Sequence, residues 1–229
     1  MDSDRLRFFV LLGVVVLLLA GWLFMGGDDS ASDGEESDHI KVIANLEKQG
    51  DAEAVAKISK YTKDRDIRVA RRSIQALGRI RGQKTDERIK LAFEDKRYEV
   101  REAAVVALGY RIDKPANVAA LREKLADPRE DINVRIAAAP ALVGARDWDA
   151  LNPLIDLLNH PKERARRIAV GSIYQILDRN YDHMYQPGSN FPESKRLAFM
   201  KFLRDFANSS QLKKENDKYK AYIKNKKGN

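Results

Sequence analysis

The residues that could carry out chemistry are few, and their spacing does not assemble a recognisable reactive site. The three histidines, His39, His160 and His183, share no metal-ligand spacing. The chain has no cysteine, which excludes a disulfide framework, a thiolate nucleophile and a cysteine-ligated metal. No glycine-rich phosphate loop or nucleophile elbow is present in the sequence. We therefore expect no catalytic residue, no metal and no cofactor, and we interpret the protein as not an enzyme.

An alanine-rich pattern of ten residues recurs along the chain and must position whatever surface the protein uses. Its copies begin at Val69, Val100, Val134 and Ala165, at intervals of 31, 34 and 31 residues, which is typical of a repeat array. Each copy places apolar or small residues at positions 1, 5, 8 and 9, the spacing of one helix face. A second amphipathic segment precedes each copy. We therefore expect pairs of helices, whose apolar faces are buried only when the pairs stack.

The layout V-R-x-x-A-A-x-A-L-G, preceded by D-x-x, resembles the HEAT repeat family, in particular the short HEAT-like repeats of phycobilin lyase subunits. The segment from Asp131 to Arg135 carries the D-x-x-V-R core intact. The first repeat departs with Ala70 where the arginine should stand, and the fourth has Lys162 in place of the aspartate. The resemblance covers residues 51–178. It implies an all-α fold, an α-solenoid of about four helix pairs with capping helices, and implies little about function.

These patterns divide the chain into four parts. We expect a cytoplasmic stub with a transmembrane helix (1–25, helix 8–25), an acidic disordered linker (26–38), a HEAT-like domain (39–208) and a basic tail (209–229). Within the domain we expect repeats near 51–82, 84–112, 115–146 and 148–178, with a capping helix at 192–208.

The segment 8–25 is the reason for expecting a membrane anchor. It is uncharged, and as a helix it would be about 27 Å long, close to the hydrocarbon thickness of a bilayer. A cleaved secretory signal is the alternative, but signal cores are shorter and end in small residues, whereas this run ends in Trp-Leu-Phe-Met. Arg5 and Arg7 precede the segment, and the first base after it is Lys41. The positive-inside rule therefore predicts a single-pass protein of the cytoplasmic (inner) membrane with an extracytoplasmic, periplasmic domain.

Charge is distributed unevenly along the chain. The formal net charge is +8, but residues 26–38 hold six acids and no base, and residues 1–25 are balanced, so residues 39–229 carry +14. The linker has too few apolar residues to fold, and we expect it to stay extended as a spacer. A strongly basic domain is attracted to polyanions, which leaves polyanion binding open as an alternative function.

Two sets of polar residues recur with the repeat, and their recurrence favours a structural role. Aspartates precede the alanine-rich copies, where helix capping explains them: Asp66, Asp95 and Asp131. Arginines stand at repeat position 2, where similar HEAT arginines bond neighbouring turns in an inter-repeat ladder: Arg101, Arg135 and Arg166. Ligand binding by these arginines is the less favoured alternative. Arg71, Arg72 and Arg167 lie outside the buried stripe and are expected to be freer to meet a partner.

The third copy, "INVRIAAAPALV", is apolar nearly all round. Ile136 and Pro140 take positions 3 and 7, where a solenoid helix should be polar, and Val106 takes position 7 of the preceding repeat. Either a flanking segment covers them, or they form an apolar binding patch; both alternatives stay open. Pro140 is expected to kink the helix. The candidate partner-binding residues, including two tyrosines of the 179–194 loop, are Arg71, Arg72, Val106, Ile136, Pro140, Arg167, Tyr181 and Tyr185.

The favoured function is a membrane-anchored protein–protein interaction scaffold in the extracytoplasmic space, whose protein partner the sequence does not name. The alternative is a tethered binder of polyanions, such as anionic lipid headgroups or surface polymers. The resemblance also implies a third reading, since HEAT-like repeats form DNA glycosylases and pigment lyases. An exported domain without a recognisable site argues against that reading, and we expect no nucleic-acid partner.

Overall fold

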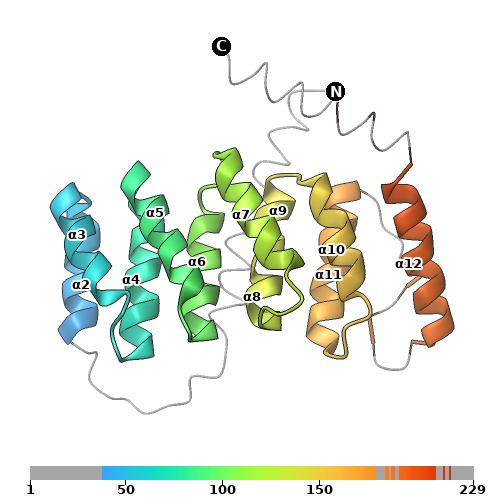
Figure 1. Cartoon of the computed structure of the whole chain (residues 1–229), viewed down its shortest axis with the longest axis horizontal. Coiled ribbons are helices and arrows are strands. Elements are labelled where there is room, and N and C mark those ends of the chain that lie inside the picture. Colours follow the sequence, from blue (N-terminus) through green and yellow to red (C-terminus); the bar gives the residue numbers. More distant parts are fainter. Residues whose placement is uncertain are drawn as a thin grey trace. The chain divides into compact units, whose positions relative to one another are not determined.

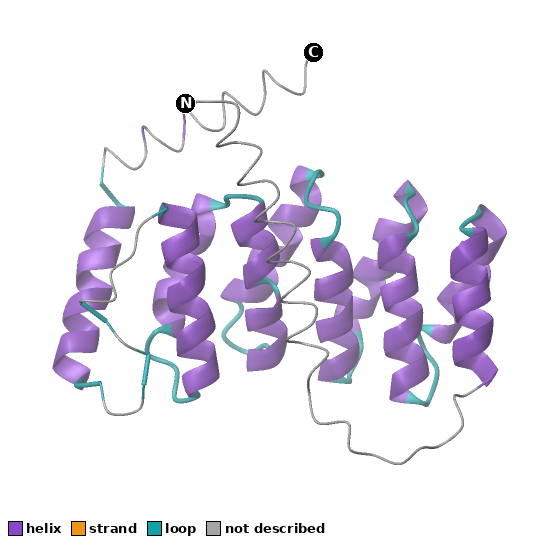
Figure 2. Cartoon of the chain, turned by 180° about the vertical axis from the view of Figure 1, so that it is seen from behind, coloured by secondary structure: helices purple, strands orange, loops and turns teal. Residues whose placement is uncertain are grey.

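The computed structural model describes residues 38–178, 184–185, 187–188 and 191–209, together with residues 214 and 217. Within these residues the regular elements are helices, and no strand is present (Figure 2). The all-α prediction is therefore confirmed for this part of the chain. The chain divides after Ala145 into two compact units, which are described separately.

The first unit is a succession of helix pairs (Figure 1). Its elements are α2 (Asp38–Gln49), α3 (Ala52–Tyr61), α4 (Ile67–Arg79), α5 (Gln83–Leu91), the 3-10 helix η1 (Ala92–Glu94), α6 (Tyr98–Gly109), α7 (Pro115–Ala126), α8 (Ile132–Ala137) and α9 (Ala139–Gly144). The alanine-rich copies form α4, α6 and α8–α9, and α6 packs against both α4 and α8. The preceding helices α3, α5 and α7 each pack against the copy that follows them. Helix α2 packs on α3 and α4 and forms the expected N-terminal cap.

Two of the three predicted aspartate caps are confirmed. Asp66 and Asp131 are the N-cap residues of α4 and α8, and each accepts a hydrogen bond from the backbone N–H two residues later, at 2.8 and 2.7 Å. Asp95 makes the same local bond to the N–H of Arg97 at 2.9 Å. However, α6 begins one residue after Arg97, so Asp95 orders the turn and is not the helix cap.

The small residues of the alanine-rich copies allow close helix packing, as the sequence indicated. A Cβ added at Gly78 of α4 would lie 2.8 Å from the Cβ of Ala107 on α6. A Cβ at Gly109 of α6 would lie 3.0 Å from the Cβ of Ala141 on α9. Both distances are shorter than an ordinary carbon–carbon contact of about 3.5–4.0 Å. The repeat-ending glycines therefore set the distance between successive helices.

Pro140 divides the third copy, as expected. Helix α8 ends at Ala137 and α9 begins at Ala139, with Pro140 in the first turn of the new helix. Proline has no N–H to donate, and its ring collides with the carbonyl one turn earlier, so a continuous helix cannot pass through it.

The second unit contains η2 (Trp148–Ala150), α10 (Leu151–Leu157), α11 (Glu163–Leu177) and α12 (Glu193–Ala207). Helix α10 packs against both α11 and α12. The buried face of α12 consists of Phe199, Met200 and Leu203. The fourth alanine-rich copy, 165–174, lies within α11, and α12 lies within residues 192–208.

No helix among the described residues is long and apolar enough to cross a membrane. The predicted anchor at 8–25 and the predicted linker, apart from its last residue, lie outside the described residues. That last residue, Asp38, is the first residue of α2, so the linker prediction extends one residue too far.

Candidate binding surface

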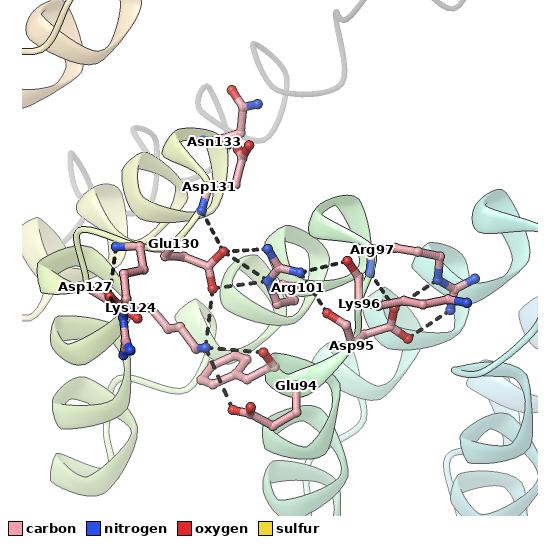
Figure 3. A network of polar contacts seen from close by, with 12 residues as sticks. Glu94, Asp95, Lys96, Arg97, Arg101, Lys124, Asp127, Glu130, Asp131 and Asn133 are labelled. Carbon is pink, nitrogen blue, oxygen red and sulfur yellow. Dashed lines mark hydrogen bonds and ion pairs between the residues drawn. The ribbon is translucent and has the colours of Figure 1, made fainter.

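The turns that join the two helices of a repeat are tied together by an ionic network centred on Glu130 (Figure 3). Arg101 of α6 donates to the backbone oxygens of Asp95 at 2.8 Å and Lys96 at 3.1 Å. The same guanidinium donates through Nη2 to the Glu130 carboxylate at 2.7 Å, and Lys124 donates to that carboxylate at 3.4 Å. The Glu130 side chain is 5% exposed. Arg101 therefore joins the turn of its own repeat to the turn of the next.

The other position-2 arginines also bond turns, and Arg166 reaches beyond its own repeat to the Pro187 carbonyl at 3.2 Å. Arg135 donates to the Leu125 carbonyl at 3.0 Å, at the end of the preceding helix. Arg166 donates to the carbonyls of His160 at 2.9 Å and Pro161 at 2.7 Å. The predicted structural role is confirmed. Bonds between repeats are not confined to position 2: besides Arg101, Arg97 bonds its own Asp95 and donates to the Asp64 carbonyl of the preceding repeat at 2.6 Å.

The Glu130 network holds its charges at neutral pH. Burial raises the pKa of Glu130, but hydrogen bonds from Arg101 and from the Asp131 N–H outweigh it, so the pKa lies below its usual value. The hydrogen bond to Glu130 raises the pKa of Arg101. A general acid or base needs a pKa near the working pH, and neither group has one. The network is therefore suited to holding turns and not to proton transfer.

A second buried network, centred on Asp86 and Arg111, was missed by the sequence analysis. Both residues are 6% exposed. Arg111 donates to the Asp86 carboxylate, and Lys114 donates to it at 2.5 Å. Arg111 also donates to Thr85 Oγ1 at 2.6 Å and to the Gly82 carbonyl at 3.0 Å. Arg111 thus anchors the turn after α6 to the turn after α4.

Burial opposes the charge of Asp86, but the bonds from Lys114, Arg111 and Asn117 lower its pKa below the usual value. The sequence carried no signal for this site. Arg111 stands in a turn outside the repeated pattern, and the acid it meets is separated from it by 25 residues.

Helix α4 carries arginines along the face opposite its buried side: Arg68, Arg71, Arg72 and Arg79. Arg72 and Arg79 bind the two carboxylate oxygens of Glu47 on α2, at 2.6 and 3.2 Å. The expectation that Arg72 is freer to meet a partner is therefore corrected, because α2 lies beside it and supplies an acid. Arg71 is half-buried, and its Nε is enclosed without a hydrogen-bond partner. Arg72 likewise has an enclosed nitrogen, Nη1, without a hydrogen-bond partner, so the two arginines differ in the acid that Arg72 binds.

The predicted apolar patch is smaller than expected. Ile136 is 1% exposed, so it is a core residue and its prediction as a surface residue is corrected. The physical reason is that the apolar residues Ile132, Val134 and Ile136 of α8 are all buried, and its partly exposed positions are the polar Asn133 and Arg135. Val106 and Pro140 are half-exposed, and their binding role stays a prediction.

In the second unit the predicted residues differ in exposure. The Arg167 side chain is 69% exposed and pairs with Glu163 one turn earlier on α11. Tyr185 is 1% exposed, its ring is stacked on Phe199 of α12 at 5.1 Å, and its hydroxyl donates to the Leu158 carbonyl at 3.4 Å. Tyr185 therefore belongs to the core of this unit, and its prediction as a partner-binding residue is corrected. Tyr181 lies outside the described residues.

Within the described part of the chain, no group of three or more histidine, aspartate or glutamate side chains is arranged to hold a metal ion. His39 lies 3.3 Å from Asp64, and the Nδ1 of His160 accepts a bond from the Lys162 N–H at 3.1 Å. Both histidines are therefore bonded to nearby groups of the chain. His183 lies outside the described residues.

Stacked helix pairs, close-packed alanine-rich helices and bonded turns define the described part of the chain as an all-helical repeat protein. A family model described as HEAT repeats matches residues 85–174, which supports the resemblance found in the sequence. No curated protein matches the chain. Among solved structures, the chain is similar to a designed armadillo repeat protein at 15% identity and a TM-score of 0.39, over 77% of this chain and 96% of that one.

Proposed function

We propose that this protein is an interaction scaffold that binds a protein partner and is tethered to a membrane by residues 8–25. The proposal rests on one observation. The two buried carboxylates of the first unit, Asp86 and Glu130, both accept bonds from arginines that hold turns together. The copy helices of this unit (α4, α6 and α8–α9, formed by the alanine-rich copies) present half-exposed side chains, among them Arg71, Val106 and Pro140. A rigid array with such a surface suits binding, since fold alone does not supply a reaction.

The uncharged segment 8–25 supports the tether, and Arg5 and Arg7, which precede it, support the extracytoplasmic location of the domain. The test is fractionation of cells that produce the full chain, followed by washing of the membranes at alkaline pH. The chain should stay in the membrane pellet, and a chain lacking residues 1–25 should be soluble. A soluble mature form that begins near residue 32 would support the cleaved-signal alternative.

The partner-binding half of the proposal has its own test. The full chain, solubilised from membranes with a mild detergent, should retain a defined protein that Val106→Glu fails to retain. Val106 is half-exposed on α6, so a carboxylate there should weaken an apolar contact without entering the core. Lys60→Glu, a change of an exposed residue on α3, is the matched control and should retain the protein.

A second candidate function, binding of a polyanion, is favoured by the arginines of α4. Contacts between exposed charges are screened by salt, so polyanion binding should weaken steeply as ionic strength rises. Binding through Val106 should change little over the same range, which separates the two functions.

A further inference from the structure

The arginine face of α4, defined as Arg68, Arg71, Arg72 and Arg79, has more positive charge than its surroundings neutralise. Residues 63–81 contain seven bases and two acids. Glu47 is shared between Arg72 and Arg79, and the exposed Arg68 pairs with its neighbour Asp66. Arg71, which is half-buried, completes the face. Two acids therefore balance four arginines, and the excess positive charge attracts an added carboxylate.

The chain itself carries an acidic segment that begins beside this face. Residues 28–37 contain five acids and no base, and they lead directly into α2 at Asp38. His39, at the start of α2, lies 3.3 Å from Asp64 and has its ring 5.1 Å from that of Tyr61. Both of these partners belong to the α3 end and the turn that precede α4. The acidic segment therefore leaves the described domain next to the first turn of α4.

The acidic segment is long enough to extend along α4. Ten extended residues reach at most about 33–36 Å, whereas the 13 residues of α4 are about 20 Å long. Helix α2 also extends alongside α4, since Glu47 near its end meets Arg72 and Arg79 in the middle and at the end of α4. The segment would be held at the millimolar effective concentration typical of a short flexible connection.

Helix α6, which packs beside α4, limits the extent of the basic surface. Its partly exposed residues include Glu99 and Glu102, whose negative charges repel an acidic segment. The N-terminus of α4 also favours negative charge through the helix dipole. Charge complementarity therefore directs the acidic segment to α4 and not further along the array.

We propose that residues 28–37 dock on the arginine face of α4 and act as an internal competitor for acidic segments of other molecules. Each exposed ion pair is weak by itself, and the docked population depends on several pairs and on the tether. Docking is therefore favoured at low ionic strength and is lost as salt rises, and an external acidic ligand gains access when it displaces the segment. This inference does not depend on the membrane anchor or on the Val106 surface.

The test uses the purified full chain in an uncharged detergent and a fluorescent synthetic peptide with the sequence of residues 26–38. The informative variant replaces the five acids of the chain's own segment: Asp28→Asn, Asp29→Asn, Asp33→Asn, Glu35→Gln and Glu36→Gln. These changes replace no residue that packs in the described helices, so the packing of those helices should be retained. At low salt the variant should bind the peptide about tenfold more tightly than the natural chain, because its internal competitor has been removed. Equal affinity of the two chains would overturn the proposal.

The site of docking is tested by adding a second change to the five-acid variant. Arg71→Gln should abolish most of that variant's gain in peptide affinity. This change removes no ion pair seen among the described residues, so circular dichroism should show that the fold is retained. Lys60→Gln removes one exposed positive charge from α3 and should keep the gain. Equal losses from both changes would mean that diffuse charge, and not the α4 face, attracts the peptide. A third measurement compares phosphatidylserine vesicles with uncharged vesicles as competitors of the peptide. Full displacement by the phosphatidylserine vesicles alone would identify a lipid headgroup site and overturn the proposal.

Discussion

Gly78 offers a quantitative test of the packing between α4 and α6. An alanine Cβ at this position would lie 2.8 Å from the Cβ, 3.0 Å from the Cα and 3.1 Å from the carbonyl oxygen of Ala107. None of these atoms is the end of a flexible side chain, so the helices must separate. Overpacking costs about 1–3 kcal/mol, and contacts with backbone atoms place this change in the upper part of that range, about 2–3 kcal/mol. The better helix propensity of alanine returns about 1 kcal/mol. Gly78→Ala should therefore lower the free energy of unfolding by about 1–2 kcal/mol.

The matched control is Gly171→Ala on α11, where an added Cβ meets no atom within 4 Å. There the propensity gain acts without a clash, and the free energy of unfolding should rise by about 0.5–1 kcal/mol. The assay is urea denaturation of both full-length variants, followed by helical circular dichroism in the same detergent. Two variants that shift stability in the same direction would refute the argument that repeat-ending glycines set the helix spacing.

Three further predictions follow from the buried groups. Ile136→Glu should destabilise the first unit by about 3 kcal/mol or more, because it buries an unpaired carboxylate, whereas Val106→Glu should melt near the natural chain; equal melting temperatures would mean that Ile136 is not core. Glu130→Gln should cost about 2–3 kcal/mol in the same urea assay, since it leaves the Arg101 guanidinium without its anion; an unchanged midpoint would show that the network contributes nothing. Glu130 and Asp86 have folded-state pKa values below the usual ones. Their contribution to the free energy of unfolding is therefore present above about pH 4.3 and is lost as pH falls through the folded-state pKa values. Unfolding measured over an acid titration should show this loss, and Glu130→Gln should make it smaller.

The sequence predicts the helix pairs well because their signal is local. Apolar periodicity, turn residues and the spacing of the copies determine where helices begin and end, and α12 has the bounds that its apolar face indicated. The break at Pro140 also follows from one residue and its missing N–H.

The binding surface was harder to predict, because exposure depends on contacts between distant segments. Arg72 looks exposed from its helix position, but an acid of α2, 25 residues earlier, binds it. Tyr185 stands in a loop without periodicity, and its burial depends on the ring of Phe199. Arg111, in the turn after α6, meets Asp86 of α5, and no repeated pattern relates the two positions. Each of these outcomes needs the tertiary arrangement, which propensity and spacing do not contain.

The measurement that tests the central claim most directly is capture of protein by the full chain from detergent-solubilised membranes, quantified by mass spectrometry for three versions of the chain. The account predicts that at least one protein is retained by the natural chain and by Lys60→Glu and is lost with Val106→Glu, although all three have the same helical content. The same proteins captured by all three versions, or none above a control resin, would contradict the proposal that the copy helices of the first unit form a partner-binding surface.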